Sequence, residues 1–292
     1  MEKKKIFYDW WIVLGAIIVL GTTGPAAVAV ANIFQSSVTA EFGISNSQFA
    51  LTNSIVLGVG IFLSPFISQK LAYGNFKRTF VIGVLLYALG YAGYGLAPNI
   101  WVIYFLSLLI GIGNTACIII PTGILINNWF VKKRGLAMSL ALTGLGFGGA
   151  ILSPLLTGLI ESIGWRQTYL VYGTVMLAVG LFVVMFVFKP RPEDIGLKPY
   201  GVEEASDLPA GAQKSGENQE QTQGVPMSVS ETMTKPFFIL LIVGGVFAGI
   251  MNNGGFGQFP PVLQNVHGAG TAVTIVSLYS AIGIAGKVIL GN

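Results

Sequence analysis

Eight long apolar stretches dominate this sequence, and one hydrophilic segment separates the first six from the last two. Each stretch holds about 18 or more predominantly apolar residues, which is enough for an α-helix to cross a bilayer. A closed β-barrel needs alternating segments of about ten residues, and the continuous apolar run 101–112 excludes it. We therefore predict membrane-spanning helices near residues 10–34, 49–68, 79–97, 101–126, 135–159, 167–188, 236–259 and 271–290.

The composition supports a membrane protein rather than a soluble domain. Hydrophobic residues make up 53% of the chain and charged residues only 10%, whereas soluble domains average about 25% charged residues. The single cysteine, Cys117, excludes an intramolecular disulfide framework and lies inside the fourth stretch, where we expect a small core residue. The predicted fold class is an all-α membrane protein.

The N-terminus allows a second interpretation. Residues 2–5 are charged, an apolar run follows, and residues 29–31 resemble a signal-peptide cleavage site. The apolar run is longer than the usual core of a signal peptide, however, and further stretches follow at once. We therefore favour an uncleaved first span that a short cytoplasmic lead precedes.

The positions of the basic residues predict the orientation of the chain. Fourteen of the sixteen Lys and Arg residues fall before the first stretch, or in the segments after the second, fourth and sixth. The opposite loops carry only Arg166, and Lys287 lies within the eighth stretch. By the positive-inside rule, the N-terminus and the hydrophilic segment are cytoplasmic. The expected contact of this basic face is anionic membrane lipid, and nucleic acid is not an expected partner.

The hydrophilic segment divides the chain into three parts. Its core, residues 203–224, is rich in Glu, Gln, Ser, Gly and Ala, and such a composition buries too little apolar surface to fold alone. We predict a six-helix bundle over residues 1–188, a flexible cytoplasmic linker over 189–235, and the first two helices of a second bundle over 236–292. We expect that much of this second bundle is missing.

Amide side chains mark the faces of the apolar stretches that avoid lipid, because an unpaired amide in hydrocarbon costs roughly several kcal/mol. Apart from Asn53, they occur in the first, fourth and seventh stretches, as Asn32, Gln35, Asn114, Asn252, Asn253 and Gln258. Helical spacing places Asn32 on one face with Thr22 and Pro25, and Asn114 on one face with Pro121. A proline inside a helix also leaves a backbone carbonyl free to meet a ligand or water. These faces can line a substrate cavity or hold helices together; we favour the cavity because the amides recur on every third stretch.

Charged side chains are almost absent from the interior of the stretches. Lys287 is the exception, and it can bind a carboxylate substrate or extend to the cytoplasmic interface. The central parts of the first six stretches contain no Asp, Glu or His. We therefore expect no enzyme chemistry, cofactor or metal, and a proton-coupling group would lie outside this half.

Two further patterns are interpreted as helix packing. Residues 144–149 fit the GxGxxG pattern, but a dinucleotide site needs a preceding strand, so we expect close helix approach instead. Tyr87, Tyr91 and Tyr94 share one face of the third stretch, and we expect them to pack or to lie at the interface rather than to bind substrate.

Several motifs together carry a family resemblance. The run 129–138, the glycines of 144–149 and Pro154 resemble the span 4–5 signature of the monocarboxylate transporter and bacterial oxalate/formate antiporter branch of the major facilitator superfamily. Residues 164–166 and 191–197 resemble this branch as well. The resemblance implies twelve helices in two six-helix bundles that rock about a central site, with small organic anions as typical substrates.

The chain departs from the family pattern at three places. Between the second and third stretches, Ala72 stands where the family motif has an acidic residue. In the eighth stretch, the Gly-Arg pair of the family is matched by Gly286 and Lys287, and lysine lacks the bidentate fork of arginine. The carboxylate that some monocarboxylate carriers have in that stretch has no match.

The sequence therefore predicts a multi-pass transporter of a small organic anion in the plasma membrane, working by alternating access with protons or a counter-anion as possible co-substrates. The expected substrate-binding residues are Thr22, Asn32, Asn114, Pro121, Asn252, Asn253 and Lys287. Membrane lipids are the other expected partners, and a full-length protein is expected to be monomeric. The alternatives are an exporter of amphipathic compounds such as drugs or bile acids, and a truncated membrane protein that does not transport.

Overall fold

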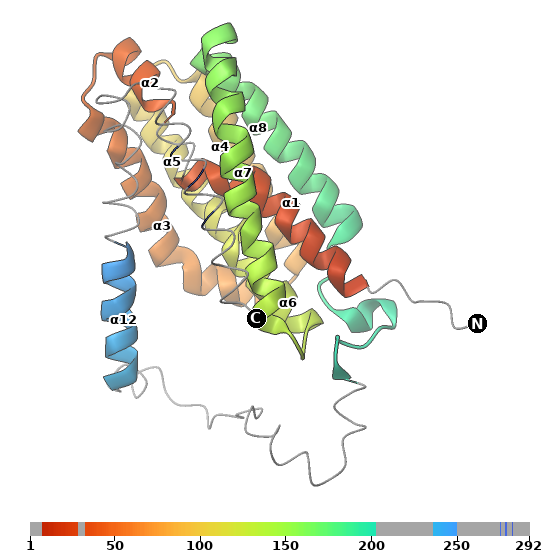
Figure 1. Cartoon of the computed structure of the whole chain (residues 1–292). Helices are drawn as coiled ribbons and strands as arrows, with labels where there is room; N and C mark the ends of the chain where they lie inside the picture. Colours follow the sequence, from red (N-terminus) through yellow and green to blue (C-terminus); the bar gives the residue numbers. More distant parts are fainter. Residues whose placement is uncertain are drawn as a thin grey trace.

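The computed structural model describes residues 8–28, 33–202 and 236–249, with three further positions at 275, 278 and 282. Its regular elements are helices: α1 (Tyr8–Val28), α2 (Gln35–Phe42), α3 (Asn46–Tyr73), α4 (Phe76–Leu96), α5 (Ile100–Cys117), α6 (Ile119–Trp129), α7 (Arg134–Ile163), α8 (Trp165–Phe182), η1 (Val183–Val187), η2 (Pro192–Ile195) and α12 (Pro236–Gly249). The part of the chain that the structure describes contains no named strand. The all-α prediction is confirmed (Figure 1).

Six helical segments of the described chain are long and apolar enough to span a membrane, as predicted for the first six stretches. They are Tyr8–Ala26, Asn46–Tyr73, Phe76–Leu96, Ile100–Trp129, Arg134–Ile163 and Trp165–Val187. In the region of the first predicted stretch, 10–34, α1 is described from Tyr8 to Val28, residues 29–32 lie outside the described residues, and a separate helix α2 begins at Gln35. In the seventh stretch α12 is described only to Gly249, and the eighth lies outside the described residues except for three positions.

Local signals in the sequence set several helix ends. Ser45 and Gln48 form a capping box at the start of α3, and the Asn75 side chain caps α4 by accepting a hydrogen bond from the Arg78 amide (3.0 Å). Gly164 joins α7 to α8 with φ at 83°, a left-handed conformation that glycine adopts at little cost. These short turns keep consecutive spans antiparallel.

Glycines set the closest helix contacts. A Cβ atom at Gly144 would overlap the Ile17 carbonyl oxygen of α1, and one at Gly148 would overlap the Gly21 carbonyl oxygen. Helices α1 and α7 therefore cross in direct backbone contact, as the red and green ribbons show (Figure 1). The predicted packing role of the glycines at 144–149 is confirmed.

The first part of the predicted linker lies against the bundle. The Trp129 indole donates a hydrogen bond to the Lys189 carbonyl (2.8 Å), and the Tyr200 amide donates one to the Trp129 carbonyl (2.8 Å). The Tyr200 carbonyl in turn accepts hydrogen bonds from the Val131 and Lys132 amides. Residues 189–202 are thereby held at the turn between α6 and α7.

Candidate functional site

The fourth span breaks near the middle of the membrane. Helix α5 ends at Cys117 and α6 begins at Ile119, with Ile118 between them at φ −105° and ψ −100°. Pro121 explains the break, because its ring has no N–H to donate and clashes with the carbonyl four residues earlier. The expected interruption of this helix by Pro121 is present.

A cavity of about 310 Å³ lies beside this break. Its lining comes from α3, the end of α5 and the break itself: Leu57, Gly60, Ile61, Ser64, Asn114, Thr115, Ile118, Ile119 and Ile120. Asn114 and Thr115 stand at the middle of the span Ile100–Trp129, and Gly60 stands at the middle of Asn46–Tyr73. The cavity therefore lies at mid-membrane depth, where transporters with interrupted helices bind their substrates.

Asn114 is the group in this cavity that can bind a polar ligand. The Thr115 and Ser64 hydroxyls donate to carbonyls of their own helices, at 3.0 Å and 3.2 Å. The Asn114 side chain is half-buried and has no hydrogen bond to another described residue. Its amide can donate to and accept from a ligand. None of the residues that line the cavity is charged, so the described part of the site offers polarity without a titrating group.

The expected substrate-binding residues do not all meet at this cavity. Asn114 lines it, and Pro121 is buried in α6 directly behind the break. Thr22 lies on α1, outside the lining, with its hydroxyl donated to the Ile18 and Val19 carbonyls of its own helix. The remaining residues, Asn32, Asn252, Asn253 and Lys287, lie outside the described residues.

The proline of α1 is in a different environment. Pro25 is buried, and the Gly21 carbonyl that it leaves without a helix partner packs against Gly148 of α7. Three tyrosine hydroxyls donate to neighbouring carbonyls of α1: Tyr172 to Thr22 (2.9 Å), Tyr87 to Thr23 (3.0 Å) and Tyr91 to Ala26 (2.9 Å). These carbonyls therefore meet protein groups, contrary to the expectation that Pro25 frees one for a ligand.

The tyrosines were expected to pack, and this is confirmed, because Tyr87, Tyr91 and Tyr94 are buried. Their hydrogen bonds to α1 were not expected from the sequence. The spacing of the tyrosines on one helix face was the available signal, but the identity of the acceptors depends on tertiary packing. Cys117 is also buried, as expected for a small core residue.

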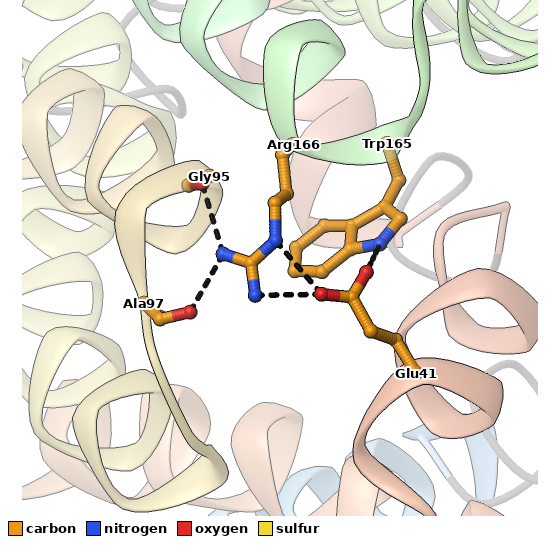
Figure 2. Close-up of polar contacts among 5 residues, drawn as sticks. All are labelled: Glu41, Gly95, Ala97, Trp165 and Arg166. Carbon is orange, nitrogen blue, oxygen red and sulfur yellow. Dashed lines mark hydrogen bonds and ion pairs between the residues drawn. The ribbon is translucent and has the colours of Figure 1, made fainter.

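A polar cluster joins α2, the end of α4 and the start of α8 (Figure 2). It lies at the end of the bundle opposite residues 189–202 (Figure 1). The Arg166 guanidinium pairs with Glu41 through Nη2 (2.8 Å) and Nε (2.9 Å), and its Nη1 donates to the Ala97 and Gly95 carbonyls. The Trp165 indole donates to the other oxygen of Glu41. Hydrogen bonds from Arg166 and Trp165 lower the pKa of the Glu41 carboxyl.

This cluster ties the protein together rather than forming an open anion site. All three guanidinium nitrogens of Arg166 donate to protein acceptors, and the negative charge of Glu41 balances the positive charge of Arg166. The pairing was not predicted, because Glu41 and Arg166 are 125 residues apart in the sequence. Within the described residues, no group of three or more His, Cys, Asp and Glu side chains could hold a metal.

Comparison with known proteins identifies the family. The profile of the Major Facilitator Superfamily matches residues 8–292. The chain belongs to this superfamily. It is 27% identical over 213 residues to monocarboxylate transporter 14 of Homo sapiens, a match that covers 71% of this chain and 40% of that protein.

Other matched proteins are diverse. The chain is 28% identical over 151 residues to the uncharacterized MFS-type transporter YcxA of Bacillus subtilis, covering 51% of this chain and 35% of YcxA. It is 32% identical over 96 residues to the riboflavin transporter RibJ of Trypanosoma brucei brucei, covering 33% and 17%. The predicted resemblance to monocarboxylate transporters is confirmed, and this superfamily member is a multi-pass membrane protein. The chain spans about two fifths of the length of the monocarboxylate transporters that it matches.

Proposed function

We propose that the chain forms the N-terminal part of a plasma-membrane transporter that moves a small organic anion by alternating access. In this proposal, residues 1–188 are one bundle, 189–235 connect it to a second bundle, and 236–292 begin that second bundle. The superfamily membership and the monocarboxylate transporters among the relatives support it.

The observation that carries the proposal is the mid-membrane cavity at the broken fourth span. A polar amide that has no partner among the described residues, at the centre of a bilayer, is costly unless a ligand or water meets it. Asn114 stands in that position beside the break before Pro121. Interrupted helices at mid-membrane are a feature that secondary transporters share.

An anionic substrate needs a cation, and we assign this role to Lys287. The described cavity supplies an amide and apolar walls but no positive charge. Lys287 is the strongly charged residue that the sequence places well inside a predicted span, and Asn32, Asn252 and Asn253 are the further amides expected around the substrate. Protons or a counter-anion would balance the transported charge, and the transporter would act as a monomer.

The orientation in this proposal follows the distribution of charge. The N-terminus and the connector are cytoplasmic, because basic residues concentrate at that end. The turn between α6 and α7, with Lys132, Lys133 and Arg134, lies on the same side. The Glu41–Arg166 cluster then faces the outside.

A second candidate function is the transport of an uncharged or amphipathic compound. The uncharged lining of the described cavity and the riboflavin transporter among the relatives favour this alternative. The two functions differ in their need for Lys287, which the amphipathic substrate would not require.

Counterflow in proteoliposomes tests both functions. The protein expressed from its whole reading frame is expected to exchange radiolabelled lactate or oxalate, and Asn114→Ala should lower that exchange about tenfold, the effect of losing one hydrogen bond to a charged group. Asn53→Ala is the matched control, because Asn53 is a half-buried amide of α3 outside the cavity lining. Lys287→Gln should abolish exchange and Lys287→Arg should retain part of it.

The outcomes separate the alternatives. Riboflavin exchange that survives Lys287→Gln would replace the anion proposal with the amphipathic one. Exchange of neither compound class, by a protein that remains folded, would contradict the transport function itself.

A further inference from the structure

A second and larger cavity lies at the cytoplasmic end of the bundle, far from the mid-membrane site. Its volume is about 650 Å³, and it lies between the first two turns of α4 and the η1 segment that ends the sixth span. Its lining residues are Asn75, Lys77, Arg78, Val81, Ile82, Val184 and Met185. We infer that this cavity binds an anionic phospholipid of the cytoplasmic leaflet.

Positive charge at the mouth of the cavity favours an anionic ligand. Lys77 and Arg78 line the mouth, and Lys189 is close enough to Lys77 to interact with it electrostatically. Among the described residues, Asp194 is the carboxylate that interacts with Lys77, and Lys189 is a further cation beside it. The ion pairs formed between described residues do not include Lys77 or Arg78. A phosphodiester group would relieve the repulsion between the lysines.

Apolar walls below the cations select a lipid over a soluble anion. Ile82 lies four residues further along α4 than Arg78, which places it about 6 Å deeper in the bilayer. Ile82 and Met185 are both exposed, at 47% and 57%, and they line the cavity together with Val81. The headgroup would lie against Lys77 and Arg78, with an acyl chain along these side chains. Basic pockets between membrane helices bind anionic lipid headgroups in this way.

The inference rests on the proposed orientation but not on transport. The two bundle ends differ in how their charges are satisfied: the outer Arg166 is paired with Glu41, whereas Lys77 and Arg78 are grouped with a further lysine. A lipid with one or two negative charges would balance the charges of Lys77 and Arg78, as Glu41 balances the charge of Arg166. Failure of counterflow would leave this site unaffected, so the two proposals fail separately.

Lipid binding can be measured by native mass spectrometry of the delipidated protein in detergent, with phosphatidylglycerol or phosphatidylcholine added. We expect retention of phosphatidylglycerol and little retention of phosphatidylcholine. The double variant K77Q/R78Q should weaken phosphatidylglycerol binding about tenfold to thirtyfold, since each cation near an anionic lipid contributes about fivefold. The matched control is R191Q/K198Q, which removes two exposed charges from the same end outside the cavity.

A second pair of variants tests the apolar wall without changing charge. I82S/M185S should weaken phosphatidylglycerol binding severalfold, whereas Leu89→Ser, an exposed α4 position outside the cavity, should not. Thermal unfolding in the same detergent confirms that each variant is folded.

Three results would overturn the inference. Equal losses in K77Q/R78Q and R191Q/K198Q would show general attraction to a basic surface, and no loss in K77Q/R78Q would place the lipid elsewhere. Displacement of phosphatidylglycerol by millimolar inorganic phosphate would show that the cavity takes a free anion.

Discussion

Pro25 and Pro121 stand inside two spans of the same bundle, but their surroundings differ. Around Pro25, tyrosine hydroxyls from α4 and α8 bind the nearby carbonyls, and Gly148 packs against the carbonyl of Gly21. Beside Pro121, the helix breaks and a cavity remains. A proline and an amide on one helix face therefore do not define a binding site. The side chains that neighbouring helices supply decide whether the interruption is filled or open.

The close packing around Pro25 depends most on the glycines where α1 crosses α7. Gly148→Val should destabilise the protein by about 3 kcal/mol or more, because the added carbon atoms would overlap the backbone of α1 and that backbone cannot move aside. Gly158→Val in the same helix should have a small effect, since a Cβ at Gly158 meets no atom within 4 Å. Thermal unfolding in detergent measures both. Equal losses in the two variants would mean that helix propensity, rather than contact with α1, sets the cost.

The tyrosine hydroxyls test how the α1 carbonyls are satisfied. Tyr87→Phe with Tyr91→Phe should lower the free energy of unfolding by about 1–3 kcal/mol, since each buried hydrogen bond contributes about 0.5–1.5 kcal/mol. Tyr104→Phe is the control, because its hydroxyl bonds to Gln48 at an exposed position. A double variant as stable as the control would show that water satisfies these carbonyls equally well.

The role of the cavity beside Pro121 can be tested by making α5 and α6 one continuous helix. Pro121→Ala supplies the missing N–H, so α5 and α6 can join, and we expect equal or greater thermal stability with a severalfold loss of substrate exchange. Pro25→Ala should leave exchange within about twofold, because its surroundings are filled by protein. The reverse order of effects, measured by counterflow, would move the substrate site from the fourth span to the first.

The smallest expected effect concerns the ion pair between Glu41 and Arg166. The pKa of Glu41 in the folded protein is lowered by Arg166 and Trp165, so the pair stabilises the fold above the ordinary glutamate pKa of about 4.5. That contribution is lost as the pH falls below 4.5 and through the lowered pKa. It should remain below about 1 kcal/mol, because both side chains are partly exposed. The difference in unfolding temperature between the native protein and Glu41→Gln should therefore shrink from pH 6 to pH 3. A difference that stays constant with pH would assign the stabilisation to shape rather than charge.

Periodicity and composition predicted much of the architecture. Six spans, the packing tyrosines and the close approach at Gly144 and Gly148 all follow from patterns within one helix. These features depend on local spacing, which a sequence displays directly. The separate helix α2 was not predicted, because its eight residues are too few and too polar to form a span.

The groups that surround Pro25 and Pro121 could not be predicted in the same way. Tyr172 reaches the Thr22 carbonyl across 150 residues of sequence, and Tyr87 reaches Thr23 across 64. The charged cavity likewise joins the start of α4 to Met185 at the end of the sixth span. Such long-range contacts arise from the packing of whole helices, and no local sequence pattern predicts them.

The docked connector has a mechanical consequence for the broken span. Because residues 189–202 are fastened at Trp129 and Val131, a pull transmitted along the connector enters the bundle at that turn rather than at the end of α8. Helix α6, of 11 residues, joins this turn to the break at Ile118. This short helix therefore couples the attachment site of residues 189–202 at one end to the Asn114 cavity at the other.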